Sequence, residues 1–220
     1  IMPIESTLDH AGPMTQNVAD NALMLEVIAG ADGLDPRQYN VVTDTYTRAV
    51  TAGASGLKIG IVKEGFGHAS SEADVDQKVR AAANILSECG ASVDEISVPW
   101  HLKGLPIWTP IASEGATNQM MHGNGMGTGW EGMYTTSLLD YHANWRGRAD
   151  ELSDTLKITM FVGQYFLKHH RGHYYAKAQN LSRQLREEYN KVFASYDLLL
   201  MPTTPMKATP IPERSEGLAT

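Results

Sequence analysis

The stretch that most constrains the fold runs from Leu57 to Val98, where two strand patterns flank one helix pattern. Residues 57–62 alternate apolar and variable positions, and residues 92–98 repeat that pattern. The segment between them is helical, with one apolar face formed by Val75, Val79, Ala82 and Leu86. Two strands joined by a helix in this order lie parallel in one sheet. The sequence therefore predicts an α/β fold.

Two local signals refine this unit. Ser71 and Asp74 have the spacing of a capping box, in which a hydroxyl and a carboxylate satisfy free N–H groups at a helix start. Gly60 lies inside the first strand and indicates a close approach by a neighbouring backbone. Gly90 follows the helix and predicts where it stops.

Residues before the first strand predict one helix between two loops. Pro3 to Pro13 contains two prolines and a glycine, so we expect an ordered loop. Helical spacing begins at Thr15, and the expected buried stripe consists of Val18, Ala22, Leu25 and Ala29. Asp32 to Ser55 shows no strong period and predicts a surface loop.

The second half of the chain predicts two long helices and a last strand. Pro99 to Tyr134 is rich in proline and glycine, and we expect only a short helix there, over Ala112 to Met121. Two helices at about residues 148–196, separated at Gly172, are expected to form a helical hairpin. Leu198 to Met201 is a continuous apolar run, typical of a strand buried on both faces.

Charge and cysteine content narrow the class of protein. The net charge of -7 is spread without long like-charge blocks, so we expect no nucleic acid partner and no anionic membrane partner. No apolar run approaches the roughly 20 residues that span a bilayer. The single cysteine, Cys89, cannot form an internal disulfide, which favours a reducing compartment and the cytoplasm. We expect its side chain to be a small buried hydrophobe.

Three patterns suggest chemistry, but each lacks its context. Gly127 to Gly132 matches G-x-G-x-x-G, yet no strand precedes it, as dinucleotide binding requires. His169 and His173 have the i, i+4 spacing of metal ligands, but a solvated basic helix end explains them better. Ser55 to Lys58 spells S-x-x-K, but it enters a strand instead of opening a helix. We expect no metal and no cofactor.

Asp9 and His10 are also a tempting pair, although adjacent residues seldom orient one another in a triad. Their segment, Ser6 to Met14 (STLDHAGPM), is followed by V-A-D-N-A-L and resembles the amidase signature family. Tyr196 to Pro205 (YDLLLMPTTP) resembles the later strand and turn of that family. Trp108 to Met121 looks most like the broad-specificity bacterial amidases associated with nitrile degradation. The resemblance spans nearly all 220 residues.

The resemblance implies a single mixed β-sheet covered by helices on both faces. Residues 1–220 then form the central to C-terminal part of one amidase domain, incomplete at both ends, with a polar loop at residues 211–220. The family hydrolyses amides with a Ser, cis-Ser, Lys triad through an acyl-enzyme. No matching serine-rich stretch or lysine occurs here, so we expect no catalytic residue in this chain. The catalytic residues are expected upstream of Ile1, and the chain alone is expected to be inactive.

Within this resemblance, Trp108 is the residue expected nearest the acyl group of a small-molecule amide substrate. Two alternatives stay open. The chain could belong to the A subunit of a tRNA-dependent amidotransferase, or it could be a non-catalytic α/β module that captures a small ligand around Gly123 to Gly132. A homodimer also stays open.

Overall fold

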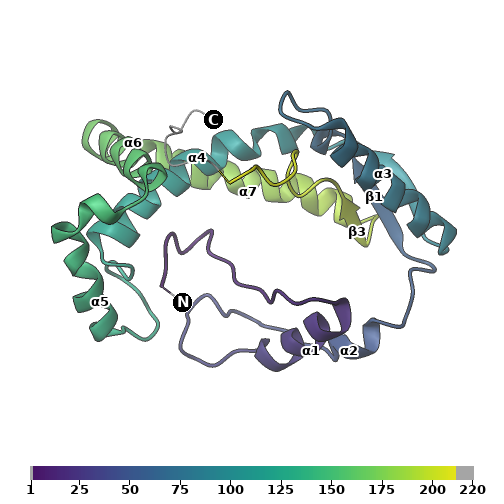
Figure 1. Cartoon of the computed structure of the whole chain (residues 1–220), viewed down its shortest axis with the longest axis horizontal. Coiled ribbons are helices and arrows are strands. Elements are labelled where there is room, and N and C mark those ends of the chain that lie inside the picture. Colours follow the sequence, from purple (N-terminus) through teal and green to yellow (C-terminus); the bar gives the residue numbers. More distant parts are fainter. Residues whose placement is uncertain (1, 212–220) are drawn as a thin grey trace. The chain divides into compact units, whose positions relative to one another are not determined.

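The computed structural model describes residues 2–211 (Figure 1); the polar loop expected at the C-terminal end lies almost wholly outside them. Its main elements are α1 (Val18–Ile28), α2 (Tyr46–Ala49), β1 (Lys58–Val62), α3 (Ala73–Glu88), β2 (Ser92–Ile96), α4 (Gly104–Gly115), the π-helix η3 (Ala116–His122), α5 (Thr136–Ala143), α6 (Asp154–His170), α7 (His173–Phe193) and β3 (Leu198–Leu200). Short 3₁₀ turns join them, including η1 (Lys63–Gly65) and η2 (Pro99–Lys103).

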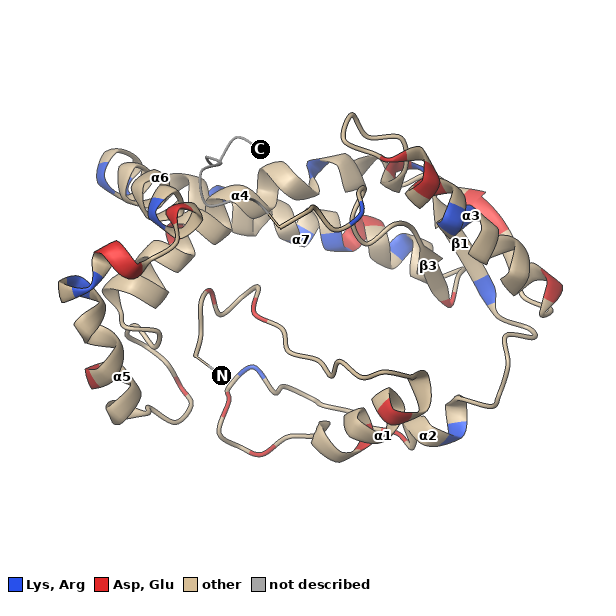
Figure 2. Cartoon of the chain, in the orientation of Figure 1, with Lys and Arg blue, Asp and Glu red and all other residues tan. Residues whose placement is uncertain are grey.

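The chain divides into two compact units. Unit 1 contains the residues up to Ala52 together with Trp108–Ala178, and unit 2 contains Gly53–Ile107 together with the described residues from Gln179 onward. That residues 1–220 belong to one domain stays a prediction. Basic and acidic residues are both present along α3 and α7, whereas α1 and α5 carry acidic residues only (Figure 2). In the described part of the chain, no helix is both long and apolar enough to cross a membrane.

The sheet lies in unit 2 and has the strand order β2-β1-β3. Both pairs are parallel, with Lys58 opposite Ser92 in one and Ile59 opposite Leu198 in the other. The central strand β1 is the most buried, because Ile59 and Val62 are almost fully covered. The predicted α/β class with a parallel sheet is therefore confirmed.

Gly60 supports the close packing of these strands. A Cβ atom built there would lie 2.6 Å from Ile96 Cδ1 and 3.2 Å from Leu199 Cδ2. The predicted approach of a neighbouring backbone at this glycine was wrong, because side chains of both neighbouring strands make the close contact. The absence of a side chain on β1 lets the neighbours cover this face of the sheet.

The start of α3 differs from the predicted capping box. The N-cap residue is Glu72, whose side chain makes no cap hydrogen bond. The Ser71 hydroxyl instead accepts a hydrogen bond from the His68 N–H at 2.9 Å. Asp74 is drawn to Lys207, with 2.6 Å between Oδ2 and Nζ. The prediction was wrong because a lysine far along the chain competes for the carboxylate that the local pattern assigns to the cap.

Three burial predictions were also wrong. Cys89 is exposed at the C-cap of α3. On α1 only Ala22 is buried, and Val18 is 71% exposed, so the expected stripe is not buried along its length. Leu198 is 49% exposed, because β3 lies at the edge of the sheet with β1 on one side only. Periodicity identified these elements, but burial depends on what packs against them.

The structure contains more helix than the sequence predicts, in two places. The expected loop after α1 contains the short helix α2. Helix α4 begins at Gly104 and passes through Pro110, where the sequence favours a break. Ile107 and Ile111 are buried on either side of this proline, so tertiary packing holds the helix together there.

The two long helices predicted in the second half are confirmed, but α6 begins at Asp154, later than the predicted start at residue 148, with Ser153 as its N-cap. Helix α6 ends at His170, and α7 begins at His173. Arg171 and Gly172 between them both have positive φ, 52° and 76°, which is the left-handed region that ends helices. Their pairing as a hairpin stays a prediction.

Candidate functional site

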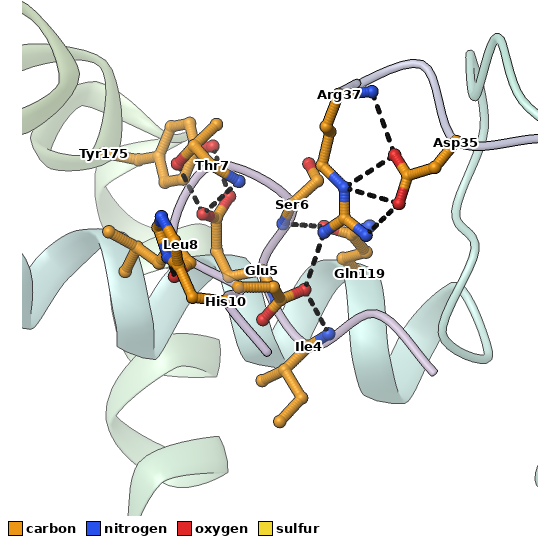
Figure 3. Close-up of polar contacts among 11 residues, drawn as sticks. Ile4, Glu5, Ser6, Thr7, Leu8, His10, Asp35, Arg37, Gln119 and Tyr175 are labelled. Atoms are coloured by element: carbon orange, nitrogen blue, oxygen red, sulfur yellow. Dashed lines mark hydrogen bonds and ion pairs between the residues drawn. The ribbon is translucent and has the colours of Figure 1, made fainter. Parts of the chain in front are cut away.

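The turn at Ile4 to Asp9 is held together by its own carboxylate (Figure 3). Asp9 Oδ2 accepts a hydrogen bond from the Ile4 N–H at 2.9 Å, and Oδ1 accepts one from the Glu5 N–H at 3.1 Å. His10 Nδ1 lies 2.6 Å from the Leu8 carbonyl oxygen. Asp9 and His10 thus each bond to backbone groups of this turn, which gives both side chains a structural role.

Glu5 ties this turn to the start of α7. Its side chain is buried, at 3% exposure, and its Oε1 accepts a hydrogen bond from the Tyr175 hydroxyl at 2.7 Å. Its Oε2 accepts two more, from the Thr7 N–H at 2.9 Å and the Thr7 hydroxyl at 2.5 Å. Three donors compensate for removing the carboxylate from water. Gly115 makes room, since a Cβ there would lie 2.1 Å from Glu5 Cγ.

The same turn also contacts the π-helix η3. The Ser6 N–H donates to Gln119 Oε1 at 2.9 Å (Figure 3). Buried side chains of Ala116, Thr117 and Met121 anchor η3. A pocket of about 420 Å³ opens beside this contact, and its walls are Ser6, Asn118, Gln119, His122, Gly123, Met126, Gly127, Thr128, Gly129 and Trp130. The glycine-rich segment therefore lines a ligand-sized space, as the binding-module alternative expects.

Arg37, in the loop after α1, links that loop to the turn at Ile4 to Asp9. Its guanidinium bonds Asp35 at 2.5 Å, reaches Asp9 at 3.4 Å and lies 5.3 Å from the centre of the Trp130 ring. The hydrogen bond to Asp35 raises the pKa of Arg37, and the same bond lowers the pKa of Asp35. Through the contact between Arg37 and Trp130, this cluster is joined to a residue that lines the pocket.

Glu114 is a buried carboxyl that the sequence reasoning missed. It is 1% exposed, and its Oε1 accepts a hydrogen bond from the Tyr175 N–H at 3.1 Å. Its Oε2 has no partner among the described residues. Burial raises the pKa of Glu114. A signal was present, because Glu114 follows Ile107 and Ile111 at helical spacing on one buried face.

Glu114→Gln is expected to change how stability depends on pH. The pKa of a glutamate side chain in an unfolded chain is about 4.3. Because the pKa of Glu114 is raised on folding, the folded protein holds this proton more tightly, and its free energy of unfolding falls as pH rises above that value. The Gln variant cannot ionise. Its stability relative to wild type should therefore grow between pH 4 and pH 7.5, as measured by urea unfolding. A difference that does not vary with pH would contradict this account of Glu114.

The remaining candidate residues and motifs from the sequence are a metal site, two short motifs and Trp108. Within residues 2–211, no cluster of three or more His, Cys, Asp or Glu side chains could hold a metal. The ring of His169 lies 4.7 Å from that of Tyr165, so it packs against an aromatic side chain. Gly127 to Gly132 follows a helix, not a strand, and Lys58 opens β1, so neither motif gains its required context. Trp108 lies on α4, is 52% exposed and is not among the residues that line the 420 Å³ pocket.

The two units together have an α/β composition of helices and parallel strands, and comparison with known proteins shows the family of the chain. The chain belongs to the amidase family, because the family model described as Amidase matches residues 1–218. It is 41% identical over 213 residues to an enantioselective amidase from Rhodococcus rhodochrous, which covers 96% of this chain and 41% of that protein.

A second relative is the A subunit of a glutamyl-tRNA(Gln) amidotransferase from Lysinibacillus sphaericus. It is 34% identical over 214 residues, or 97% of this chain and 43% of that protein. The chain thus spans about two-fifths of the length of these curated relatives.

Solved structures show the same fold. The A subunit of glutamyl-tRNA(Gln) amidotransferase from Thermotoga maritima matches 98% of this chain and 42% of its own, with a TM-score of 0.65 and 22% identity. A bacterial aryl acylamidase of the amidase signature family matches 87% of this chain and 36% of its own, with a TM-score of 0.63 and 24% identity. The expected amidase signature fold is confirmed.

Proposed function

We propose that the protein hydrolyses linear carboxylic amides to acid and ammonia, in the cytoplasm. The observation that carries this proposal is the match to the amidase family over residues 1–218, together with 41% identity to an enantioselective amidase over nearly the whole chain. Residues 1–220 supply the scaffold and part of the pocket wall. The catalytic lysine and two serines lie upstream of Ile1.

In this mechanism the nucleophilic serine oxygen attacks the amide carbonyl and gives its proton, through the bridging serine, to the lysine. The C–N bond then breaks, and the nitrogen takes up a proton as ammonia leaves. Water attacks the acyl-serine ester, which releases the carboxylic acid and restores the serine. The turn at Ile4 to Asp9 contributes by holding η3 and the start of α7 in position through Gln119 and Tyr175.

The first test separates scaffold from catalyst. Residues 1–220 expressed alone are expected to release no ammonia from benzamide, whereas the intact protein releases it. Ammonia is measured with a coupled dehydrogenase assay, and circular dichroism checks that the shorter chain is folded. Turnover by residues 1–220 that survives active-site serine reagents would overturn the placement of the catalytic residues.

Trp108→Ala is expected to lower kcat/KM for benzamide about tenfold, which corresponds to about 1.4 kcal/mol of transition-state binding. Because Trp108 is half-exposed, the free energy of unfolding should change by less than about 1 kcal/mol. Trp108→Phe, which keeps an aromatic ring, should recover most of the activity. Unchanged kinetics in Trp108→Ala would show that this side chain does not contact the acyl group.

The alternative function is that of an amidotransferase A subunit, which the 34% identity to that class favours. In this role the protein passes ammonia to a partner instead of releasing it. Co-purification with partner proteins and amide transfer to a charged tRNA would decide for it. Ammonia release by the purified protein without partners supports the free amidase.

A further inference from the structure

A second cavity, of about 720 Å³, lies in unit 2 where the three parallel strands end. Gly65, His68 and Ser70 follow β1. The lining residues after β2 are His101, Leu102, Gly104, Leu105 and Pro106, and those after β3 are Met201, Pro202, Thr203 and Pro205. Leu185 and Tyr189 of α7 complete the walls. In open α/β sheets, ligands bind in the crevice outside the carboxyl ends of the strands.

The three strand exits are fastened to one another. Glu64, just after β1, accepts hydrogen bonds from the Val98 N–H at 2.7 Å and from the Ser97 hydroxyl, both just after β2. Gly65 lets the exit of β3 approach, since a Cβ there would lie 2.7 Å from Met201 Cβ. The walls of this crevice are therefore set by the sheet itself, which is the condition for a largely preformed binding site.

The lining has a polar side and an apolar side, and none of the described lining residues is Asp, Glu, Lys or Arg. On the polar side, His101 Nδ1 lies 2.7 Å from the Tyr189 hydroxyl, and the His68 and His101 rings are 6.4 Å apart. Burial, then the neighbouring His68, lowers the pKa of His101, so this imidazole is neutral at pH 7.5. Leucine and proline side chains form the apolar side.

This lining selects against charged ligands. An anion would find no lysine or arginine on the described walls, and the negative charge of Glu64, which acts on His101, would repel it. A cation would find no carboxylate on the walls either. Burying an unpaired charge is strongly unfavourable, whereas a neutral head with both donor and acceptor groups matches imidazole and hydroxyl partners.

We propose that this crevice binds a small uncharged molecule with a carboxamide head on the His68, His101 and Tyr189 side and an apolar body against Leu102, Leu105 and Leu185. The volume lies within the range of small-molecule sites. The inference goes beyond the proposed function, because it concerns binding in unit 2 and does not depend on turnover.

Three probes that share one body and differ in the charge of the head test the proposal: benzamide, benzoate and benzylamine. The intact protein, first inactivated with an active-site serine reagent so that benzamide is not hydrolysed, is titrated with each probe at pH 7.5, and the imidazole NMR signals of His68 and His101 are followed. Benzamide is expected to shift both signals and to bind at least tenfold more tightly than the two charged probes. Absence of a benzamide shift, or benzoate binding as tightly, would overturn the proposal.

Matched variants locate the binding. Leu185→Trp fills the crevice and should weaken benzamide binding at least tenfold, whereas Gln184→Trp, on the exposed side of the same helix, should not. Tyr189→Phe removes the hydroxyl beside His101 and should weaken binding severalfold. Tyr189→Phe provides the test of the proposal if Leu185→Trp fails to fold. Undiminished benzamide binding in Tyr189→Phe, with the same His101 shift, would contradict the assigned head-group contact.

Discussion

Replacing Gly163 with alanine is expected to destabilise the protein by about 3 kcal/mol, at the upper end of what overpacking usually costs. Helix α6 packs on α4 and η3 through this glycine. A Cβ atom at position 163 would lie 2.2 Å from the Ser113 carbonyl oxygen and 2.2 Å from Thr117 Oγ1. The first neighbour is helix backbone, and Thr117 is buried, so neither can move aside without shifting a helix.

Urea unfolding of Gly163→Ala measures this effect, and Gly104→Ala is the matched control. Gly104 has a helical φ of -56° and no heavy atom within 4 Å of a built Cβ. Alanine there should be neutral or stabilise by up to about 1 kcal/mol, because it favours helix. Equal effects of the two substitutions would contradict the close packing of α6 on α4.

Glu5→Ala is expected to destabilise the protein by a similar amount, about 3 kcal/mol. The substitution removes a buried acceptor and leaves the Tyr175 hydroxyl, the Thr7 N–H and the Thr7 hydroxyl without it. A hydrogen bond to a charged group contributes about 1.5 to 3 kcal/mol, and the exposed Thr7 can bond to water instead, so the lost contact with Tyr175 accounts for most of the expected cost. The turn at Ile4 to Asp9 should loosen from α7 as well.

A double-mutant cycle with Tyr175→Phe isolates the contact. The single variant Tyr175→Phe removes one hydroxyl and should cost about 1.5 to 2 kcal/mol. Because both residues share one hydrogen bond, the double variant should be less destabilised than the sum of the two single effects, by about 1 kcal/mol. Strict additivity would show that the 2.7 Å contact does not stabilise the protein.

The elements predicted best were those with a local signal. The pattern of the sequence alone located the strands β1 and β2 and the helices α3, α6 and α7. Alternating or helically spaced apolar residues are recognisable within a short stretch of sequence. The two prolines and the glycine of Pro3 to Pro13 predicted an ordered loop, which the structure confirms. This turn could be predicted from local sequence, because the two backbone N–H groups that bond to Asp9 lie within five residues of it.

What could not be predicted depends on residues far apart in the sequence. Glu5 is buried because Gly115 makes room for it and Tyr175 bonds to it. The capping box failed for the same kind of reason, because Lys207 attracts Asp74. The crevice in unit 2 assembles from the exits of three strands, and no single segment carries its pattern.

We propose that the intact protein is a serine amidase whose nucleophile lies outside residues 1–220. The most direct measurement is rapid-quench mass spectrometry of the protein during turnover of benzamide, followed by peptide mapping of the acyl adduct. The account predicts a benzoyl group on a serine upstream of Ile1 and unmodified peptides throughout residues 1–220. An adduct on a residue within 1–220, such as Ser6, or ammonia release without any adduct, would contradict it.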